Sequence, residues 1–507
     1  MKRKKRVTLI TVLVLVMVML LAACGGKTEK ATDTKVDVTP TVVAKDNTET
    51  VEVVDAVVPL EPVELTWYYF GDSPGKDAEL VEAKMGEYLK DKINATIKLY
   101  PMGWDEFGTK TKAMAAANEP MDIVFSAQWI GFSEGIASNR WLDITDLFGQ
   151  YCPKTKALMG EEWIAGGTVN DRFYAVSTMK EIGHAYGFMV NKELLEKYNL
   201  SLDNVKSLED MRPLLEVIKA NEPDVVPFDT SVLGVDVLLP QESISGDILP
   251  LVTEPSSDKV ILSSELPGYS DLLNTVHDFF LKGYIPSDVS TAKESMQGKR
   301  DNGLVFAFVS QLNPASAASN SNDKVTWETV YITPITISNN DIGGSMNSIS
   351  ATSKNPERAL MFLELLNTDV YLNNLLAFGI EGKHYNMVSE NTIEKIPDSG
   401  YSHGNQWVFA NQFLNYYTTN DDPNKWEIIA EFNEKATPER SLGFKYDLEP
   451  WVEAVGAIKL IQSEYYDGVG LQEPVSALES RLERLNEAGI NDLKEDLNAK
   501  YNEWLKK

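Results

Sequence analysis

Large aromatic side chains stand at several predicted strand ends and loops, close to short polar side chains. The aromatic members are Tyr69, Phe70, Trp104, Trp129, Tyr186, Trp327 and Trp407. A sugar ring presents a face of C–H groups that packs on an aromatic plane, and its hydroxyls need the donors and acceptors of Asp, Glu, Asn and Gln. Each ring taken alone is better explained by core packing, because large aromatics dominate cores. The whole set predicts a site for a sugar-like ligand.

Strands alternate with helices in the segment that carries the first of these rings. The pattern predicts strands over 64–70, 95–100 and 122–126, and helices over 80–93 and 105–117. This alternation favours a parallel sheet, in which ligands bind beyond the carboxyl ends of the strands. The loops at those ends contain Trp104, Gln128 and Trp129. We therefore expect these three side chains at a binding site.

The rest of the chain continues the mixed pattern. Further strands are predicted over 186–190, 303–310 and 346–351, and helices over 208–220, from Asn355 onward and from Leu471 onward. The fold class is therefore α/β. The chain has 507 residues, more than one hydrophobic core usually accommodates, so two domains are expected.

The N-terminus has the features of a secretory signal peptide. Five basic residues precede the apolar run from Val7 to Leu21, which is too short to span a bilayer. The run ends in Leu21-Ala22-Ala23-Cys24, which resembles the lipobox of bacterial lipoproteins. That resemblance implies cleavage of residues 1–23, lipidation of the Cys24 sulfur and anchoring at the outer face of the membrane. Residues 24–63, without an aromatic residue after Cys24, are expected to form a disordered tether.

Charge and motif content exclude several classes of protein. Without the signal peptide, 42 basic and 75 acidic residues leave a net charge of −33, which disfavours a nucleic-acid partner. Cys152 is the only cysteine besides Cys24, so no internal disulfide is expected once Cys24 is acylated. No nucleotide-binding loop, nucleophile elbow or zinc-type histidine spacing occurs, so the sequence predicts no cofactor, no metal and no enzyme activity.

Several segments resemble the extracellular solute-binding proteins of family 1, the carbohydrate-binding components of ABC importers. Tyr186-Gly187-Phe188-Met189-Val190-Asn191-Lys192-Glu193-Leu194 is similar to the family's strand that runs into an Asn-Lys-(Asp/Glu)-Leu helix start. Asn355-Pro356-Glu357-Arg358-Ala359 is similar to its late Asn-Pro-Glu-x-Ala helix. Segments 379–385, 404–407 and 488–490 resemble a lipoprotein subgroup with a longer C-terminal region. The likeness spans nearly all of residues 64–507.

This resemblance implies a two-lobed fold of the type II periplasmic-binding-protein kind, with a hinge and a cleft between the lobes. The expected N-terminal lobe comprises 64–176 and 328–376, and the C-terminal lobe comprises 177–327 and 377–507. A monomer is expected, which captures a solute, an oligosaccharide by this resemblance, and delivers it to the subunits of an ABC permease.

Family ligand positions carry over to individual residues of this chain. The loop after the first strand corresponds to Phe70 and Asp72, and the loop after the third to Gln128 and Trp129. The first crossing between lobes corresponds to Glu181 and His184. Phe308, Asn347 and Trp407 are further positions that the resemblance implies. With Trp104, Tyr186 and Trp327 from the aromatic set, these residues make up the predicted ligand site.

Two other classes stay open at this point. A binder of a peptide or a polyamine would need a cluster of cleft carboxylates or an aromatic cage. A surface glycan-processing enzyme would need two carboxylates facing one another about 5 to 10 Å apart.

Overall fold

Two β-sheets, each covered by helices, organise the chain. The computed structural model describes residues 60–103, 106–230, 234–245, 249–287, 296–465 and 474–506. The predicted signal peptide, Cys24 and Trp104 lie outside these ranges, as does the predicted tether apart from 60–63. Within the described ranges, no helix combines the length and the apolar character that crossing a membrane requires.

The first sheet has five strands in the order β2-β1-β3-β15-β6. These strands are β1 (Val63–Phe70), β2 (Ala95–Met102), β3 (Ile123–Ser126), β6 (Ala175–Ser177) and β15 (Met346–Ile349). β1 pairs in parallel with β2 and β3, as the alternation of strands and helices predicts, and β15 joins antiparallel to β3. We call the body around this sheet the first lobe.

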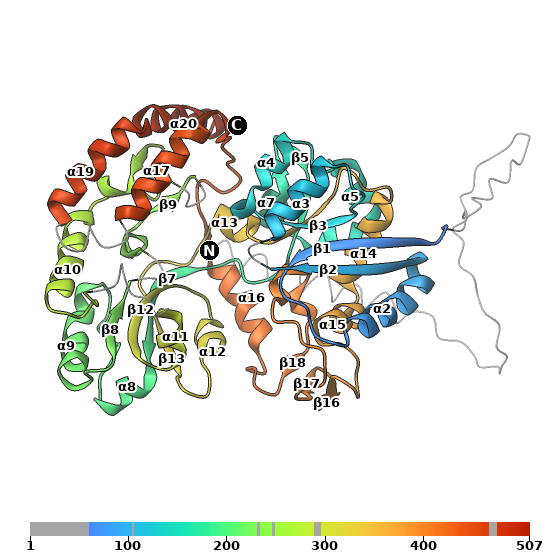
Figure 1. The fold of residues 1–507 in the computed structure, drawn as a ribbon, viewed down its shortest axis with the longest axis horizontal. Coiled ribbons are helices and arrows are strands. Elements are labelled where there is room, and N and C mark those ends of the chain that lie inside the picture. The colour runs from blue at the N-terminus through green and yellow to red at the C-terminus, as the bar shows by residue number, and fades with distance from the viewer. Residues whose placement is uncertain are drawn as a thin grey trace, which may run out of the picture. The chain divides into compact units, whose positions relative to one another are not determined.

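Helices surround the first sheet, and most of them bury apolar side chains in its core. They are α2 (Ala78–Ile93), α3 (Phe107–Ala116), α4 (Phe132–Ala137), α5 (Thr145–Tyr151), α6 (Pro153–Leu158), α7 (Glu161–Gly167), α14 (Pro356–Thr368) and α15 (Val370–Phe378). In α2, for example, Val81, Met85, Leu89 and Ile93 are buried, at the spacing that predicts a helix in this segment. Figure 1 shows α2 alongside β1 and β2.

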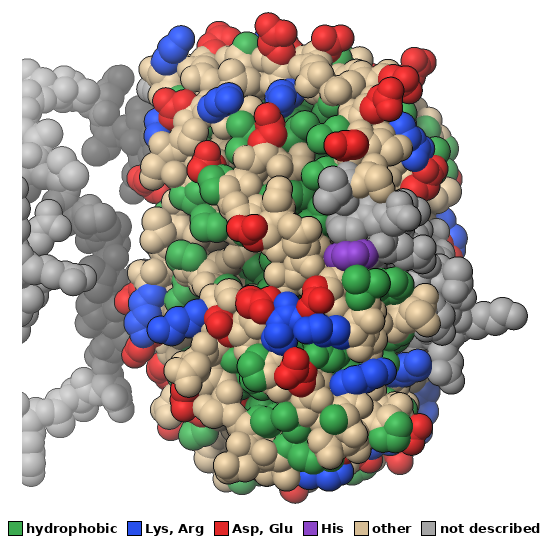
Figure 2. Space-filling model, turned by 90° about the vertical axis from the view of Figure 1, so that its left-hand side faces the viewer, with side chains coloured by type: hydrophobic (Ala, Val, Ile, Leu, Met, Phe, Trp, Pro, Cys, Tyr) green, Lys and Arg blue, Asp and Glu red, His purple; other side chains and the backbone are tan. Residues whose placement is uncertain are grey.

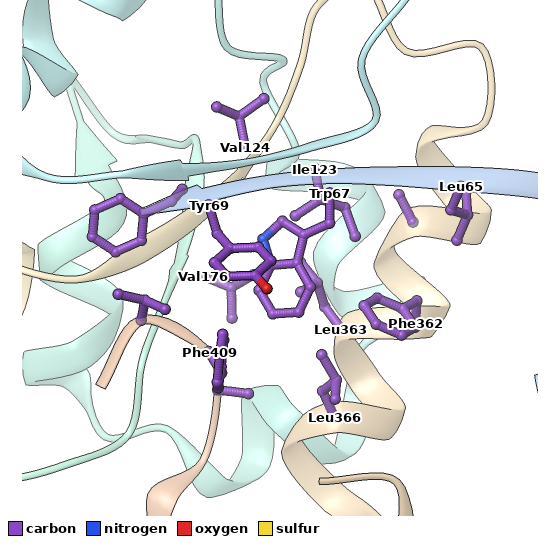
Figure 3. Close-up of a cluster of buried hydrophobic side chains, with 14 of the residues drawn as sticks. Leu65, Trp67, Tyr69, Ile123, Val124, Val176, Phe362, Leu363, Leu366 and Phe409 are labelled. Atoms are coloured by element: carbon purple, nitrogen blue, oxygen red, sulfur yellow. The ribbon is translucent and has the colours of Figure 1, made fainter. Parts of the chain in front are cut away.

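Trp67 on β1 lies at the centre of the core of the first lobe. Its ring packs edge-on against Phe362 of α14, with centroids 5.8 Å apart, and against Phe409, at 5.6 Å. Figure 3 shows Phe409 and the α14 side chains gathered around Trp67 and Tyr69. Tyr401, Val408 and Ala410 are buried in the same cluster. The chain around 401–410 therefore packs in the first lobe, although the sequence assigned 377–507 to the other lobe, because its apolar side chains complete the core beneath β1.

The second sheet has four strands in the order β13-β7-β12-β8. These are β7 (Ala185–Asn191), β8 (Val226–Asp229), β12 (Val305–Leu312) and β13 (Trp327–Tyr331). Around it lie α8 (Lys192–Lys197), α9 (Arg212–Asn221), α10 (Tyr269–Leu281), α11 (Met296–Asp301) and α12 (Ser316–Asn320). β13 pairs with β7 along its whole length, so residues 328–331 belong to this body, although the sequence placed them in the N-terminal lobe.

The C-terminal helices form an addition to the second sheet's body. α17 (Val452–Glu464), α19 (Pro474–Glu487) and α20 (Ile490–Trp504) pack on a small sheet of β9 (Glu242–Ser243), β10 (Leu251–Thr253) and β11 (Val260–Leu262). Figure 1 shows these helices grouped together. Helix α10 contacts α19, which ties the addition to the second sheet. We call this whole body the second lobe.

Three chain segments cross between the lobes and are hydrogen-bonded to one another. The first crossing joins β6 to β7, and its His184 forms a two-way backbone bridge with Thr336 of the second crossing. The second crossing contains β14 (Thr336–Ile337), which pairs in parallel with β19 (Thr437–Pro438) of the third. Asn433 of α16 (Lys425–Lys435) accepts hydrogen bonds from Ile182 N and Gly183 N. The crossings therefore form one connected hinge.

The remaining elements are short. They are β4 (Thr168–Val169), β5 (Arg172–Phe173), α13 (Asn339–Gly343), β16 (Tyr385–Met387), β17 (Thr392–Lys395), β18 (Tyr417–Thr418) and the 3₁₀ turns η1 (Gln128–Ile130), η2 (Glu209–Met211), η3 (Val235–Leu238), η4 (Ser263–Glu265), η5 (Gln406–Val408), η6 (Gln412–Leu414) and η7 (Glu449–Trp451).

Candidate functional site

Trp129 stands at the carboxyl end of the parallel strands, where the sequence predicts a binding residue. It lies on η1, the turn that follows β3. The side chain is 44% exposed, yet its indole Nε1 donates a hydrogen bond of 2.8 Å to the Gly344 carbonyl. The hydrogen bond fixes the direction of the ring, so Trp129 presents an oriented aromatic plane to solvent.

Two further predicted aromatics support Trp129. The Phe70 ring lies 5.9 Å from the Trp129 ring in a T-shaped arrangement, and the Trp407 ring lies 6.5 Å from it. Phe70 and Trp407 are 6.0 Å apart, and Phe70 is only 2% exposed. The structure therefore brings together Phe70, Trp129 and Trp407 from distant parts of the chain. Phe70 is the buried member of this cluster and packs against both tryptophans.

A cavity of about 720 Å³ lies between the two lobes. Its lining includes Gln128, the residue that precedes Trp129 in the sequence. The first lobe and the second crossing contribute polar and small residues, namely Gln128, Gly131, Ser133, Glu134, Ala137, Ser138, Asn339 and Asn340. The second lobe contributes Ile244, Ser245, Phe444, Lys445, Tyr446, Asp447, Leu448, Glu449, Val452, Val455 and Lys459. We call this cavity the inter-lobe pocket. A volume of this size is typical of small-molecule sites.

Gln128 is the predicted site residue that lines the inter-lobe pocket. Its half-buried side chain lies against Gly343 of α13, where an added Cβ would come within 2.5 Å of Gln128 Cγ. Only glycine at 343 leaves room for this position of the glutamine. The close approach of η1 and α13 therefore sets where the Gln128 amide lies.

His184 lies in the hinge and is buried. Its Nδ1 is 2.8 Å from Asp341 Oδ2, and Gln311 of β12 donates to the other oxygen of the same carboxylate at 3.0 Å. Tyr186 is half-buried, with its ring edge-on to His184 at 5.0 Å. The arrangement links the first crossing, the second crossing and the second sheet, so these two predicted residues hold the hinge together.

Asn347 on β15 is buried beneath the aromatic cluster. Its Oδ1 accepts a hydrogen bond from Trp67 Nε1 at 3.0 Å, and its Nδ2 donates to the carbonyls of Val408 and Phe409. All of these partners are protein groups. In this structure Asn347 holds the segment that carries Trp407 rather than facing the inter-lobe pocket.

Phe308 and Trp327 lie inside the second lobe. Both are buried, and their rings pack edge-on with centroids 5.1 Å apart. They share a cluster with Met189 and Val305 of the second sheet and with Val325, which precedes β13. This placement differs from the expected one because the core needs large apolar side chains on these strands.

Asp72 and Glu181 lie at the surface or close to it. Asp72 is exposed in the loop after β1, and Glu181 is half-buried in the first crossing. Lys180 donates to Glu181 Oε1 at 3.2 Å. Neither residue is among those lining the inter-lobe pocket.

The second-lobe wall of the inter-lobe pocket was missed by sequence reasoning. Phe444-Lys445-Tyr446-Asp447 has the same mixture of aromatic and polar side chains that predicted the other site residues. Asn339-Asn340-Asp341 also carries a signal, since its polar side chains interrupt an apolar region. Asn339 ties the pocket wall together, donating to the Ser441 carbonyl and accepting from Gly443 N.

Comparisons with known proteins find similarity over most of the chain. Residues 440–506 match the family model described as domain of unknown function DUF3502. A carbohydrate ABC transporter substrate-binding protein of Streptococcus pneumoniae serotype 4 (strain ATCC BAA-334 / TIGR4) is 28% identical over 453 residues, 87% of this chain and 90% of the relative.

Solved structures agree in fold along nearly the same length. The N-glycan transport solute binding protein NgtS from Streptococcus pneumoniae has a TM-score of 0.78 and 25% identity, covering 88% of this chain and 99% of NgtS. NgtS in complex with Man5GlcNAc, at the same identity and coverage, has a TM-score of 0.69.

In sequence and in fold, the chain is similar to solute-binding proteins along most of its length. The resemblance seen in its sequence is thus confirmed, and so is the two-lobed α/β fold that it implied. A solute-binding protein works outside the cytoplasmic membrane, and its relatives here are binding proteins rather than enzymes. The inter-lobe pocket has walls from both lobes, and Gln128 in its lining is next to Trp129 in the sequence.

Proposed function

We propose that this solute-binding protein captures an oligosaccharide between its lobes and delivers it to the permease of an ABC importer. The observation that carries the proposal is Trp129, an exposed indole whose direction is fixed by its hydrogen bond to Gly344. The relatives described as carbohydrate and N-glycan binding proteins support the same ligand class.

The Trp129 cluster offers what a pyranose ring needs. The face of the indole packs on the C–H groups of the sugar, and burying that area stabilises the complex at about 25 cal/mol per Å². Trp407 extends the aromatic surface, and Phe70 supports it from beneath. Hydroxyl groups of the sugar are left for the Gln128 amide and other polar side chains of the inter-lobe pocket. We propose Trp129, Trp407 and Gln128 as ligand contacts on the first lobe.

Closure of the lobes converts binding into a signal for the permease. The inter-lobe pocket has walls from both lobes, so a ligand that contacts both walls binds the closed form more tightly than the open form. A ligand that contacts one wall shifts no equilibrium.

We also propose that Cys24 carries a lipid that anchors the protein at the outer face of the membrane. The basic segment, the short apolar run and Ala22-Ala23-Cys24 support this modification. With Cys24→Ser, the protein is expected in the medium instead of the membrane fraction.

A thermal-shift screen of the purified mature protein against oligosaccharides tests the proposed ligand class. Oligomannose glycans, human milk oligosaccharides and fructo-oligosaccharides form the panel, with peptides and polyamines as the other ligand classes. A true ligand at 100 times its Kd raises the free energy of unfolding by about 2.7 kcal/mol. A shift produced only by peptides or polyamines would overturn the oligosaccharide proposal.

A further inference from the structure

The second-lobe wall of the inter-lobe pocket contains a cation that is shielded from solvent. Lys445 lies in the loop between β19 and η7 and lines the pocket. The residue as a whole is half-buried, but its Nζ is out of reach of solvent and has no hydrogen-bond partner within the described ranges. A buried ammonium group is costly unless an acceptor satisfies it. Lys445 is therefore a buried hydrogen-bond donor without an acceptor in the described ranges.

A second donor in the same state lines the pocket from the first lobe. Gln128 Nε2 is buried and has no hydrogen-bond partner within the part of the chain that the structure describes. Its position is fixed by the contact with Gly343 rather than by a polar group. Each lobe thus contributes to the lining of this cavity one residue with a buried N–H donor that has no partner within the described ranges.

The acidic residues of the pocket are engaged elsewhere or stand at its edge. Glu134 pairs with Lys112 at 2.9 Å, and Asp447 accepts a hydrogen bond from the backbone N of Glu449. Glu449 itself is exposed. Burial lowers the pKa of Lys445 to about 8, which still leaves the group mostly protonated at neutral pH. Within the described ranges, no carboxylate of the pocket forms a hydrogen bond with the Lys445 ammonium group.

We infer that the captured oligosaccharide carries a carboxylate-bearing sugar unit, whose carboxylate accepts hydrogen bonds from Lys445 and Gln128. This inference rests on the proposed function and narrows its ligand class from oligosaccharides to acidic oligosaccharides. A carboxylate accepts several hydrogen bonds at once, and bonds between charged partners are about twice as strong as neutral ones. A neutral sugar hydroxyl would satisfy the donors but leave the charge uncompensated.

Matched ligand pairs test this inference by calorimetry on the mature protein. One pair is 3′-sialyllactose and its methyl ester, and the other is trigalacturonic acid and its methyl ester, because esterification removes the charge and keeps the sugars. The acidic member of at least one pair is expected to bind tenfold or more tightly than its neutral partner. The pair that responds distinguishes a sialic acid from a hexuronic acid.

Two lysine variants separate the role of Lys445 from the general charge of the pocket. Lys445→Met keeps the length of the side chain without the charge, and the preference for the acidic ligand is expected to disappear. Lys459→Met removes an exposed lysine that lines the same pocket, and the preference is expected to persist. Without ligand, Lys445→Met is expected to unfold at the same temperature as the wild type or higher, because an unpaired buried charge is gone.

Equal affinity for both members of each pair would overturn the inference while leaving the proposed function intact. The inference also fails alone if only neutral oligosaccharides bind, or if Lys445→Met retains the full preference. If no oligosaccharide of any charge binds, the proposed function fails and the inference fails with it.

Discussion

At the scale of single residues, the proposed binding site depends most on Trp129. We predict that Trp129→Ala lowers the affinity for the oligosaccharide about tenfold, because the stacking surface is lost. Since the side chain is 44% exposed, the free energy of unfolding is expected to change by less than about 1 kcal/mol. Isothermal calorimetry and urea unfolding measure the two effects.

The control for Trp129 is Tyr371→Ala on α15. Tyr371 is equally exposed, at 44%, but lies beside Tyr88 of α2 and away from the inter-lobe pocket. Its substitution is expected to leave affinity unchanged. If Trp129→Ala instead unfolds several degrees early and binds normally, its ring serves the core and not the ligand.

His403 gives a prediction about acid stability. Burial beside Tyr69 and Phe409 lowers the pKa of His403 to about 3, whereas an unfolded histidine titrates near 6.5. Below pH 6.5 the unfolded state binds a proton that the native state does not, so stability falls as the pH drops toward 3. The slope from this group approaches about 1.4 kcal/mol per pH unit.

The variant His403→Gln removes this titration. Urea unfolding at pH 6.5, 5.5 and 4.5 is expected to show a shallower loss of stability than the wild type, whatever the absolute stability of the variant. An identical slope in both proteins would mean that His403 is protonated in the native state.

At the scale of elements, the close contact between η1 and α13 shapes the inter-lobe pocket. We predict that Gly343→Ala weakens oligosaccharide binding severalfold, because the added Cβ displaces the Gln128 side chain. In the matched control Gly456→Ala, on α17, nothing lies within 4 Å of the new Cβ. That helical substitution is expected to keep affinity and to stabilise the protein by about 0.5–1 kcal/mol. Equal affinities of the two variants would show that the position of Gln128 is immaterial.

Local sequence patterns predict some of these elements and miss others. The parallel strands β1, β2 and β3 were predictable because their alternation with helices is a local pattern, and the site near Trp129 follows from the rule on strand ends. The buried positions of Phe308 and Trp327 were not predictable, because a single aromatic residue has the same sequence signature in a core and in a cleft. Lys445 and Phe409 depend on contacts between residues far apart in the chain, which no local pattern encodes.

At the scale of the whole molecule, the hinge permits a prediction about shape. Saturation with the oligosaccharide is expected to reduce the radius of gyration in small-angle scattering, since a ligand that contacts both lobes favours closure. A monosaccharide too small to reach both walls of the inter-lobe pocket is expected to bind without this reduction. An unchanged radius with the full ligand would mean that capture proceeds without closure.

The charges of the protein provide no long-range attraction for the acidic ligand inferred above. Figure 2 shows Lys and Arg side chains interspersed with Asp and Glu on the face that it draws. The whole chain carries a formal net charge of −28, so an acidic ligand is repelled at a distance. Because the Debye length is about 8 Å in physiological salt, that repulsion fades before the ligand reaches the pocket.

The first sheet is interrupted along the chain, and this has a consequence for the order of assembly. β1 lies near the start of the folded chain, but β15, the strand after β3 in the sheet order, comes much later in the sequence. Phe409, which packs on Trp67 of β1, comes later still. All four strands of the second sheet are present by Tyr331. During export, which begins at the N-terminus, the body that starts first is thus completed later. Until more than three hundred further residues have crossed the membrane, Trp67 and Tyr69 of β1 lack their packing partners. We expect β1 to depend on a holding chaperone during that time.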